Sequence, residues 1–418
     1  MARNDVIEVN NGEGWRSGDK KIVGLLTFSH AVQHFYAAGL ALTYPFVISA
    51  FHVSYSSLGI LLAVSGVVGG LLQGAAGLAR RFSARFLLSG QNVSLGVVTF
   101  LAAFSPGFLI YGLLRFIGAL VLWPQHPVGS AYLSETFPKK RGTVLSWHTT
   151  GGTLGTLLVP IATTAVIANF GWRTALVALS IPMALGGLVL IGNLPLEASR
   201  TKGSDAHTQA SRQPGEPSMF SQIVKNKAAV LVIIASTVSA AGRGLGILTA
   251  FVPIYLKNGA HLSTVTVGLV YTVLVGGGVV GPLIAGWLSD KIGRKGVLMA
   301  AYLGGALSFV LFVQKYSSPW LLALVSLFVG MLAYSESPLI QSLFSDTIGP
   351  SQARAAFGIF FAIAYGVGAL WFALIGFIID KYGFQVAFYI MGLSFVVSAV
   401  LISPKFIKSQ SHPQINPH

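Results

Sequence analysis

Long apolar runs recur along the whole chain, and each run is bounded by charged or turn-forming residues. An α-helix rises about 1.5 Å per residue, so about 20 apolar residues are enough to cross the hydrocarbon core of a bilayer. Only 9% of the residues are charged, against roughly 25% in soluble domains, so the apolar surface is too extensive for a soluble core. The pattern predicts an all-α membrane protein with twelve transmembrane helices, near residues 22–50, 56–79, 86–104, 108–134, 143–168, 173–194, 227–256, 264–289, 296–314, 319–345, 354–379 and 385–403.

The 27 Lys and Arg residues are distributed unevenly between the predicted loops. If the N-terminus is cytoplasmic, 21 of them fall in cytoplasmic segments and only four fall on the other side of the membrane. This bias follows the positive-inside rule, so we expect a protein of the inner (cytoplasmic) membrane with both termini in the cytoplasm. The net charge of +15 is therefore interpreted as a topology signal, and no nucleic-acid partner is expected.

The longest polar stretch lies in the middle of the chain and predicts a flexible cytoplasmic linker. The sequence on either side of it repeats, because Ser134-Glu135-Thr136 matches Ser345-Asp346-Thr347 at an offset of 211 residues. We therefore expect two six-helix bundles in a parallel pseudo-repeat. The predicted parts are a cytoplasmic N-terminal tail (1–21), an N-terminal bundle (22–195), the linker (196–226), a C-terminal bundle (227–404) and a cytoplasmic C-terminal tail (405–418).

A glycine-rich charged loop follows the second predicted helix of the C-terminal half, with the key positions Gly286, Asp290, Lys291, Gly293 and Arg294. This segment resembles the signature loop of the major facilitator superfamily (MFS). The resemblance implies the MFS fold, and it implies a secondary transporter that works by alternating access. Asp290 is expected to pair with a basic group across a moving interface as a gating latch, although a solvated loop that only fixes topology is the open alternative.

The corresponding loop of the first half, Gly77 to Phe86, keeps only Gly77 and Arg85 of that signature. Weaker resemblances lie elsewhere in the same half. The segment Gly151 to Pro160 is similar to the glycine-rich antiporter motif, and the regions His30 to Pro45 and His126 to Ser130 are similar to fosmidomycin-resistance-type efflux proteins. These resemblances favour export of a solute in exchange for protons.

Few polar side chains lie inside the predicted spans, where a charged group costs roughly 2.5–3.5 kcal/mol on insertion scales. Nearly all of them fall on the first, fourth, seventh and tenth helices, which line the central cavity in the family that the chain resembles. The resemblance therefore implies cavity positions for His30, His34, Arg115, Gln125, Arg243 and Glu336.

Arg115 and Arg243 are fixed positive charges, one in each half. A guanidinium suits a carboxylate or a phosphate, so the pair favours a small organic anion held between the halves. The open alternative is that each arginine is neutralised inside the protein, with Glu336 as the partner of Arg243.

Glu336 is the carboxylate that lies deepest in a predicted span, so it is the first candidate to carry a coupling proton. A permanent salt bridge is its alternative role. His30 and His34 are four residues apart, so they share one helix face. This placement fits a contact with the substrate or with protons, and His34 is the second candidate proton carrier. A helix-packing hydrogen bond is the next alternative, and a metal site is expected least because no third ligand is evident nearby.

Among the aromatic residues, Trp123 and Tyr334 are predicted to line the cavity. No cofactor is expected, and the absence of HExxH and GxSxG motifs argues against an enzyme. We expect a monomer in a lipid bilayer, with a small-molecule substrate and protons as its partners. Uptake of an organic anion by symport and a transport-inactive receptor or assembly subunit remain as alternatives.

Overall fold

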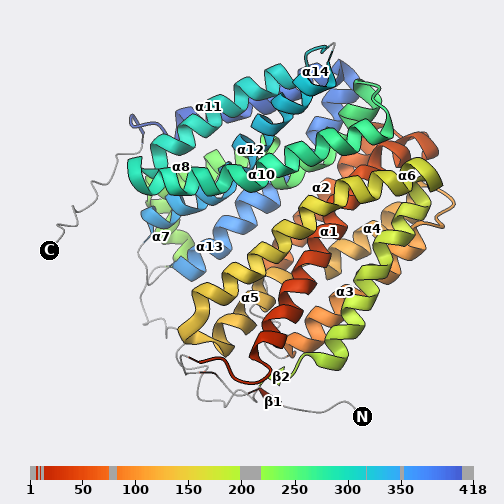
Figure 1. Cartoon of the computed structure of the whole chain (residues 1–418). Helices are drawn as coiled ribbons and strands as arrows, with labels where there is room; N and C mark the ends of the chain where they lie inside the picture. Colours follow the sequence, from red (N-terminus) through yellow and green to blue (C-terminus); the bar gives the residue numbers. More distant parts are fainter. Residues whose placement is uncertain are drawn as a thin grey trace.

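The computed structural model describes residues 6–7, 10, 14–74, 82–197, 218–316, 318–348 and 353–406, and the described part is almost entirely helical. Helices α1 to α6 form the first helix group, in which α6 packs on both α1 and α3. A second helix group, α8 to α14, lies beside it (Figure 1). The first group consists of α1 (Asp19–Phe51), α2 (Tyr55–Gly74), α3 (Ala84–Ala102), α4 (Phe108–Val121), α5 (Gln125–Thr136), the 3-10 turn η2 (Pro138–Lys140) and α6 (Arg141–Asn193).

The second helix group begins after the short α7 (Met219–Lys225), which lies in the stretch predicted as a linker. Its long helices are α8 (Lys227–Ser239), α10 (Thr264–Ile292), α11 (Arg294–Phe312), α12 (Pro319–Thr347) and α14 (Leu370–Leu401). Short helical pieces join them: η4 (Ala240–Gly242), η5 (Gly244–Leu248), α9 (Thr249–Ile254), η6 (Tyr255–Gly259), α13 (Ala353–Phe361), η7 (Ala362–Gly366) and η8 (Val367–Ala369).

Within the described residues, nine helical segments are long and apolar enough to cross a membrane. Two of them, Pro138–Asn193 and Ala356–Leu401, contain 56 and 46 residues, more than twice the length that one crossing needs. Each long segment contains one glycine with a positive φ, which is 84° at both Gly171 and Gly383. A residue with a side chain is strained at such a φ, so these glycines are where each continuous segment turns.

Three helices that the sequence predicted as continuous are interrupted in the structure. The predicted helix 108–134 divides between α4 and α5, next to Pro124. The predicted helix 227–256 changes to 3-10 and π geometry after Ser239 and contains Gly246 with φ 136°. The predicted helix 354–379 is distorted over residues 362–369. The sequence prediction was wrong here because proline and glycine are tolerated in membrane helices, so their positions do not mark breaks.

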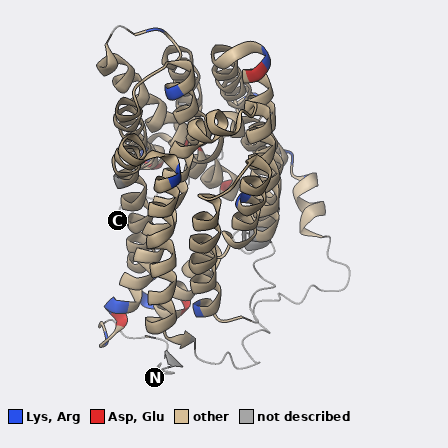
Figure 2. Ribbon diagram, turned by 90° about the vertical axis from the view of Figure 1, so that its right-hand side faces the viewer, with Lys and Arg blue, Asp and Glu red and all other residues tan. Residues whose placement is uncertain are grey.

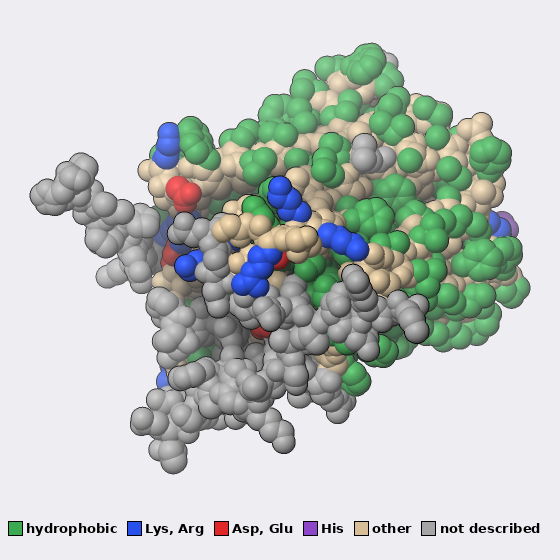
Figure 3. All heavy atoms as spheres, turned by 60° about the horizontal axis from the view of Figure 1, so that its bottom comes forward, with side chains coloured by type: hydrophobic (Ala, Val, Ile, Leu, Met, Phe, Trp, Pro, Cys, Tyr) green, Lys and Arg blue, Asp and Glu red, His purple; other side chains and the backbone are tan. Residues whose placement is uncertain are grey.

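Large apolar side chains are exposed all around the flanks of the molecule, and Trp320 and Leu109 are 83% and 74% exposed. Figure 3 shows apolar side chains over the flank and Lys and Arg side chains at the end of the molecule that is turned forward. In Figure 2 most charged positions likewise lie near the two ends of the helices. A continuous apolar belt between charged ends requires lipid as its solvent, so the chain is a multi-pass membrane protein.

At one end of the molecule, segments far apart in sequence meet. Strand β1 (Val6–Ile7) pairs in parallel with β2 (Leu196–Glu197), and the Asn10 amide donates to the Thr136 carbonyl at 2.9 Å. We call this the basic end, because the Lys139–Lys140–Arg141 run also lies there, with Lys140 Nζ 2.5 Å from the Gly14 carbonyl oxygen. The N-terminal segment, the end of α5 and the end of α6 are therefore on the same side.

Helices α1 and α6 form the closest pair of the first group because glycine removes side chains from their contact. A Cβ atom at Gly155 of α6 would lie only 2.0 Å from the Ala31 carbonyl oxygen of α1. The two backbones therefore approach each other as small-residue interfaces in membranes do. This packing fixes the position of the histidines on α1 relative to α6.

Candidate functional site

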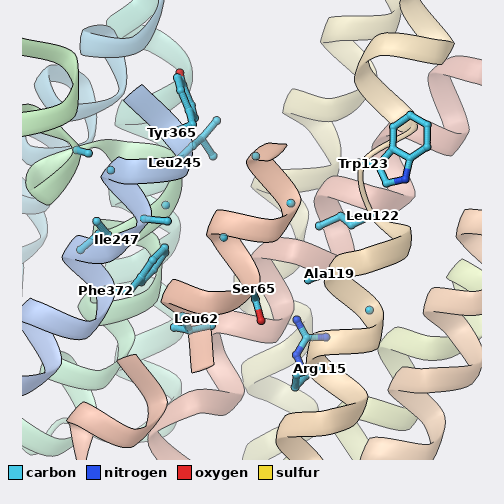
Figure 4. A pocket seen from close by; sticks show the side chains of 18 of the residues that line it. Leu62, Ser65, Arg115, Ala119, Leu122, Trp123, Leu245, Ile247, Tyr365 and Phe372 are labelled. Carbon is cyan, nitrogen blue, oxygen red and sulfur yellow. The ribbon is translucent and has the colours of Figure 1, made fainter. Parts of the chain in front are cut away.

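A central cavity lies between the two helix groups and consists of two adjoining hollows of about 300 and 370 Å³. Tyr36, Arg115 and Leu122 of the first group and Leu245 and Phe372 of the second line both hollows. Figure 4 shows the first hollow, with Arg115 of α4 pointing toward α2 and with Leu245, Tyr365 and Phe372 on the other side. Volumes of this size accommodate a small organic molecule.

The interrupted helices supply much of the cavity wall. Leu122 and Trp123 lie in the break between α4 and α5, Leu245 and Gly246 lie in η5, and Tyr365 lies in the distorted segment after α13. Irregular backbone at membrane depth occurs where it is buried in protein or borders a water-filled cavity. The three departures from the predicted helices are therefore concentrated at the cavity.

Arg115 is the cavity cation without a carboxylate partner among the described residues. One of its terminal nitrogens donates to the Tyr36 hydroxyl, and its guanidinium carbon lies 5.6 Å from the centroid of the Tyr36 ring. Its Nε atom is buried and has no hydrogen-bond partner in the described part of the chain. The first hollow therefore has a positive charge on its wall that described protein groups do not neutralise.

Arg243, in contrast, is fully engaged by protein groups. Its Nε donates to Glu336 Oε2 at 2.8 Å, and one terminal nitrogen donates to the Ser236 carbonyl at 2.5 Å and the Ser236 hydroxyl at 2.8 Å. The Tyr365 ring lies 4.3 Å from its guanidinium carbon. Arg243 has extended backbone angles, φ −61° and ψ 134°, directly after η4, and there it can reach back to α8.

Glu336 lies behind Arg243 and does not line either hollow. It is completely buried, and it accepts a hydrogen bond from Ser239 Oγ at 2.7 Å in addition to its bonds from Arg243. The Tyr302 hydroxyl lies 3.4 Å from the same carboxylate oxygen. Of this ion pair, Arg243 lines the first hollow and Glu336 does not.

The histidines of α1 belong to a larger cluster. His34 and His126 line the second hollow, and His30 lies behind them against His148 of α6. His30, His34 and His126 each offer a ring nitrogen, and these three atoms lie within 4.8 Å of one another. The prediction that no third ligand lies nearby was wrong, because α5 carries His126 to α1 across 92 positions of the sequence.

The remaining predicted contact residues divide between the cavity and helix interfaces. Trp123 lines the first hollow and Tyr334 lines the second, with the Tyr334 hydroxyl 3.1 Å from Thr249 Oγ1. Gln125 is completely buried and lines neither hollow, because its Oε1 accepts a hydrogen bond from Ser29 of α1 at 3.0 Å. Gln125 therefore lies at the interface of α1 and α5.

The predicted gating loop joins α10 to α11. Gly293 has φ 95° and ends α10, and Arg294 forms an ion pair with Asp346 at the end of α12. Asp290 is exposed and has no partner among the described residues, while Lys291 Nζ lies 3.9 Å from the centroid of the Trp287 ring. Gly77 and its neighbours to Arg81 lie outside the described residues, so the latch of Asp290 stays a prediction.

A contact between the two helix groups that the sequence analysis missed lies at the end opposite the basic end. Asp380 of α14 accepts hydrogen bonds from the amides of Tyr55 and Ser56 at 2.9 and 2.7 Å and from the Ser56 hydroxyl. Its carboxylate thus caps the N-terminus of α2, where the helix dipole favours a negative charge. No sequence signal identifies this pairing, since Asp380 and α2 are more than 300 positions apart.

The sequence analysis also missed the two serines that bind the Arg243–Glu336 pair, although the spacing of polar residues in the sequence indicates them. Ser236, Ser239 and Arg243 are spaced three and four residues apart, which would place them on one face of a continuous helix. Those two serines are the neutral partners of the Arg243–Glu336 pair. Polar residues on one face of an apolar run therefore pointed to a buried polar cluster.

Comparisons with known proteins agree with this architecture. The sequence profile described as Major Facilitator Superfamily matches residues 26–371 and, in a second match, residues 234–417. The chain is 23% identical over 377 residues to the fosmidomycin resistance protein of Escherichia coli (strain K12), which covers 88% of each chain. It is 24% identical over 362 residues to the cis,cis-muconate transport protein of Acinetobacter baylyi, which covers 84% of this chain and 83% of that protein. The crystal structure of the nucleoside transporter NupG superposes with a TM-score of 0.75 at 16% identity and covers 93% of this chain and 100% of that chain.

Proposed function

The chain belongs to the major facilitator superfamily and is a secondary transporter of small solutes, and from this premise we propose that its solute is an organic anion whose movement is coupled to protons, by export in exchange for them or by uptake together with them. The resemblance of the Gly286–Arg294 loop to this family is thereby confirmed. Membership of this family also agrees with the expectation that the protein is not an enzyme.

The proposed moving bodies are the two halves, residues 22–195 and 227–404, with six crossings each. The nine segments support twelve crossings if Gly171 and Gly383 each divide a segment and if α3, with 19 residues, crosses as well. The basic end then faces the cytoplasm, in accord with the positive-inside rule. The solute site is the central cavity, because it is lined from both halves.

Arg115 is the observation that carries the proposal of an anion. A guanidinium on the cavity wall without a described carboxylate partner retains its full attraction for a carboxylate or a phosphate. Arg243 lacks this capacity because Glu336 already neutralises it. One relative is named for cis,cis-muconate, an organic anion at neutral pH, which is in accord with this substrate class.

Proton coupling is proposed to act through the Arg243–Glu336 pair. A proton on Glu336 cancels the negative charge that holds Arg243, and the freed guanidinium can then turn toward the cavity and a bound anion. Loss of the proton restores the pair. The anion and the Glu336 carboxylate thus compete for the same arginine, so a proton on Glu336 favours binding of the anion, which is the relation that co-transport of the two requires.

The test is flux into and out of liposomes that contain the purified full-length protein. A panel of monocarboxylates, dicarboxylates and phosphate esters is compared with neutral and cationic molecules of similar size, with and without an imposed pH gradient. We expect saturable flux of anions only, and we expect this flux to respond to the pH gradient. Counterflow of protons would favour export by exchange. Co-transport of protons in the same direction as the anion would favour uptake by symport. Absence of flux for every compound would favour the transport-inactive receptor and overturn the proposal.

Alternating access gives Asp380 a testable role. Asp380 joins the two helix groups at the end opposite the basic end, and this end must open once in each transport cycle. Replacing Asp380 by asparagine keeps the shape and removes the charge that caps α2. A charge at a helix N-terminus contributes about 0.3–1 kcal/mol, so the closed state at that end should lose about two- to fivefold in population. The chain contains no cysteine, so spin labels on Ala50→Cys and Tyr382→Cys can report the distance across this end.

The matched control is Asp346→Asn, which removes a carboxylate that pairs with Arg294 within the second helix group. We expect this variant to leave the distance distribution between the two labels unchanged. An Asp380→Asn protein with the same distribution as the parent would show that the cap does not hold the two halves together.

A further inference from the structure

The histidine cluster beside the second hollow has the arrangement of a metal site. His30 and His34 lie on one face of α1, and His126 reaches them from the start of α5. Ring nitrogens of the three residues lie within 4.8 Å of one another. Three imidazoles converging in this way form the protein part of a tetrahedral site with one position left open.

The second nitrogen of each histidine on α1 already has an oxygen partner. His30 Nδ1 lies 2.7 Å from the His148 carbonyl oxygen, and His34 Nδ1 lies 3.1 Å from Thr156 Oγ1. A carbonyl can only accept, so His30 carries its proton on Nδ1 in the neutral form, and its Nε2 presents a lone pair. Metal-binding histidines are oriented by such bonds to carbonyls and hydroxyls.

No described protein group donates a hydrogen bond to the lone pair on His30 Nε2. His30 Nε2 is buried and has no hydrogen-bond partner among the described residues. An unpaired buried acceptor of this kind is costly unless a ligand satisfies it. His148 holds the ring from behind, because the two imidazoles stack with centroids 4.2 Å apart and its own Nδ1 lies 3.1 Å from the Leu26 carbonyl oxygen.

Helix α6 leaves room for the rings at Gly152. A Cβ atom there would lie 2.8 Å from His30 Cε1 and 3.1 Å from His34 Cδ2. An ion coordinated tetrahedrally at about 2.05 Å needs nitrogens about 3.4 Å apart, so nitrogens that now lie up to 4.8 Å apart must approach by up to about 1.4 Å. His126 can move by this amount because it is exposed to the cavity and makes no hydrogen bond in the described part of the chain.

We propose that His30, His34 and His126 bind one divalent transition-metal ion of the Zn²⁺ class, with the fourth coordination position open to the second hollow. Neutral imidazole nitrogens select Zn²⁺, Co²⁺, Ni²⁺ or Cu²⁺ over Mg²⁺ and Ca²⁺, which require oxygen ligands. Arg115 lines the same hollow, so a water molecule or an anion that completes the coordination shell lies near a fixed positive charge. The site depends only on the histidines and does not require that the transported solute be an anion.

The test is metal binding by the purified full-length chain, which carries no polyhistidine tag and is first stripped with a chelator. Co²⁺ is the probe because tetrahedral and octahedral Co²⁺ differ in visible absorption. We expect saturation of a tetrahedral signal at one equivalent and its loss when Zn²⁺ is added. The affinity should fall as the pH is lowered, because protons compete with the metal ion for the imidazoles.

The variants are His126→Asn and His34→Asn, with His52→Asn as the matched control. His52 is exposed at the end of α1 with φ 51°, a conformation that asparagine accepts. Each cluster variant should weaken Co²⁺ binding by at least about tenfold, while the control should bind as the parent does. No saturable binding by the parent, or equal binding by His126→Asn and the parent, would overturn the proposal whatever the transport assay reports.

Discussion

Replacing Arg115 by glutamine is expected to lower kcat/KM for anion transport by about 10- to 100-fold, because a hydrogen bond to a charged group contributes about 1.5–3 kcal/mol. Glutamine preserves a polar side chain at the cavity wall but removes the positive charge. Arg115→Lys should give an intermediate value, since an ammonium keeps the charge and loses the planar fork. Initial rates of solute flux in liposomes, measured over a range of solute concentrations, provide the comparison.

The stability of the same variant distinguishes a binding role from a structural one. Arg115 places a charge at membrane depth without a described carboxylate partner, so its removal should leave the apparent melting temperature unchanged or raise it. Arg141→Gln is the matched control, because Arg141 is exposed at the start of α6 and lines neither hollow. A lower melting temperature together with unchanged kcat/KM would assign Arg115 to structure through its bond to Tyr36.

The transmembrane organisation could be deduced from the sequence because the hydrophobic effect acts on each run separately. A run of about 20 apolar residues is inserted whatever its neighbours are, so most predicted spans correspond to observed helices. The breaks next to Pro124 and Gly246 could not be deduced. Their cost depends on whether a neighbouring helix or a cavity satisfies the freed backbone groups, and that is a property of the packed structure.

The members of the candidate site could be predicted, whereas their pairing could not. The high cost of a buried charge marked Arg115, Arg243 and Glu336 as exceptional within apolar runs. Their different roles follow from direct hydrogen bonds, in which Arg243 has the carboxylate of Glu336 as its partner and Arg115 has the phenol of Tyr36. The approach of His126 to His34 is likewise a tertiary event, so the sequence alone left the metal site unsupported.

Removing either member of the Arg243–Glu336 pair is expected to abolish proton-driven transport and to destabilise the protein. Breaking a buried ion pair leaves one uncompensated charge and costs about 3–5 kcal/mol. Arg243 and Glu336 are only 4% and 0% exposed, so water does not compensate the charge that remains. Arg243→Gln and Glu336→Gln should each lower the apparent melting temperature in detergent and reduce flux driven by a pH gradient to the level of protein-free liposomes.

The double variant Arg243→Gln/Glu336→Gln separates coupling from folding. It leaves no unpaired charge, and its two amides can bond to each other and to Ser236 and Ser239, so the melting temperature should return most of the way to that of the parent. If Glu336 carries the coupling proton, this stable protein should still exchange solute for solute through Arg115 but should not accumulate solute in response to a pH gradient. Accumulation equal to that of the parent would exclude Glu336 as the proton carrier and would leave the histidine cluster as the candidate group, because His34 faces the same cavity.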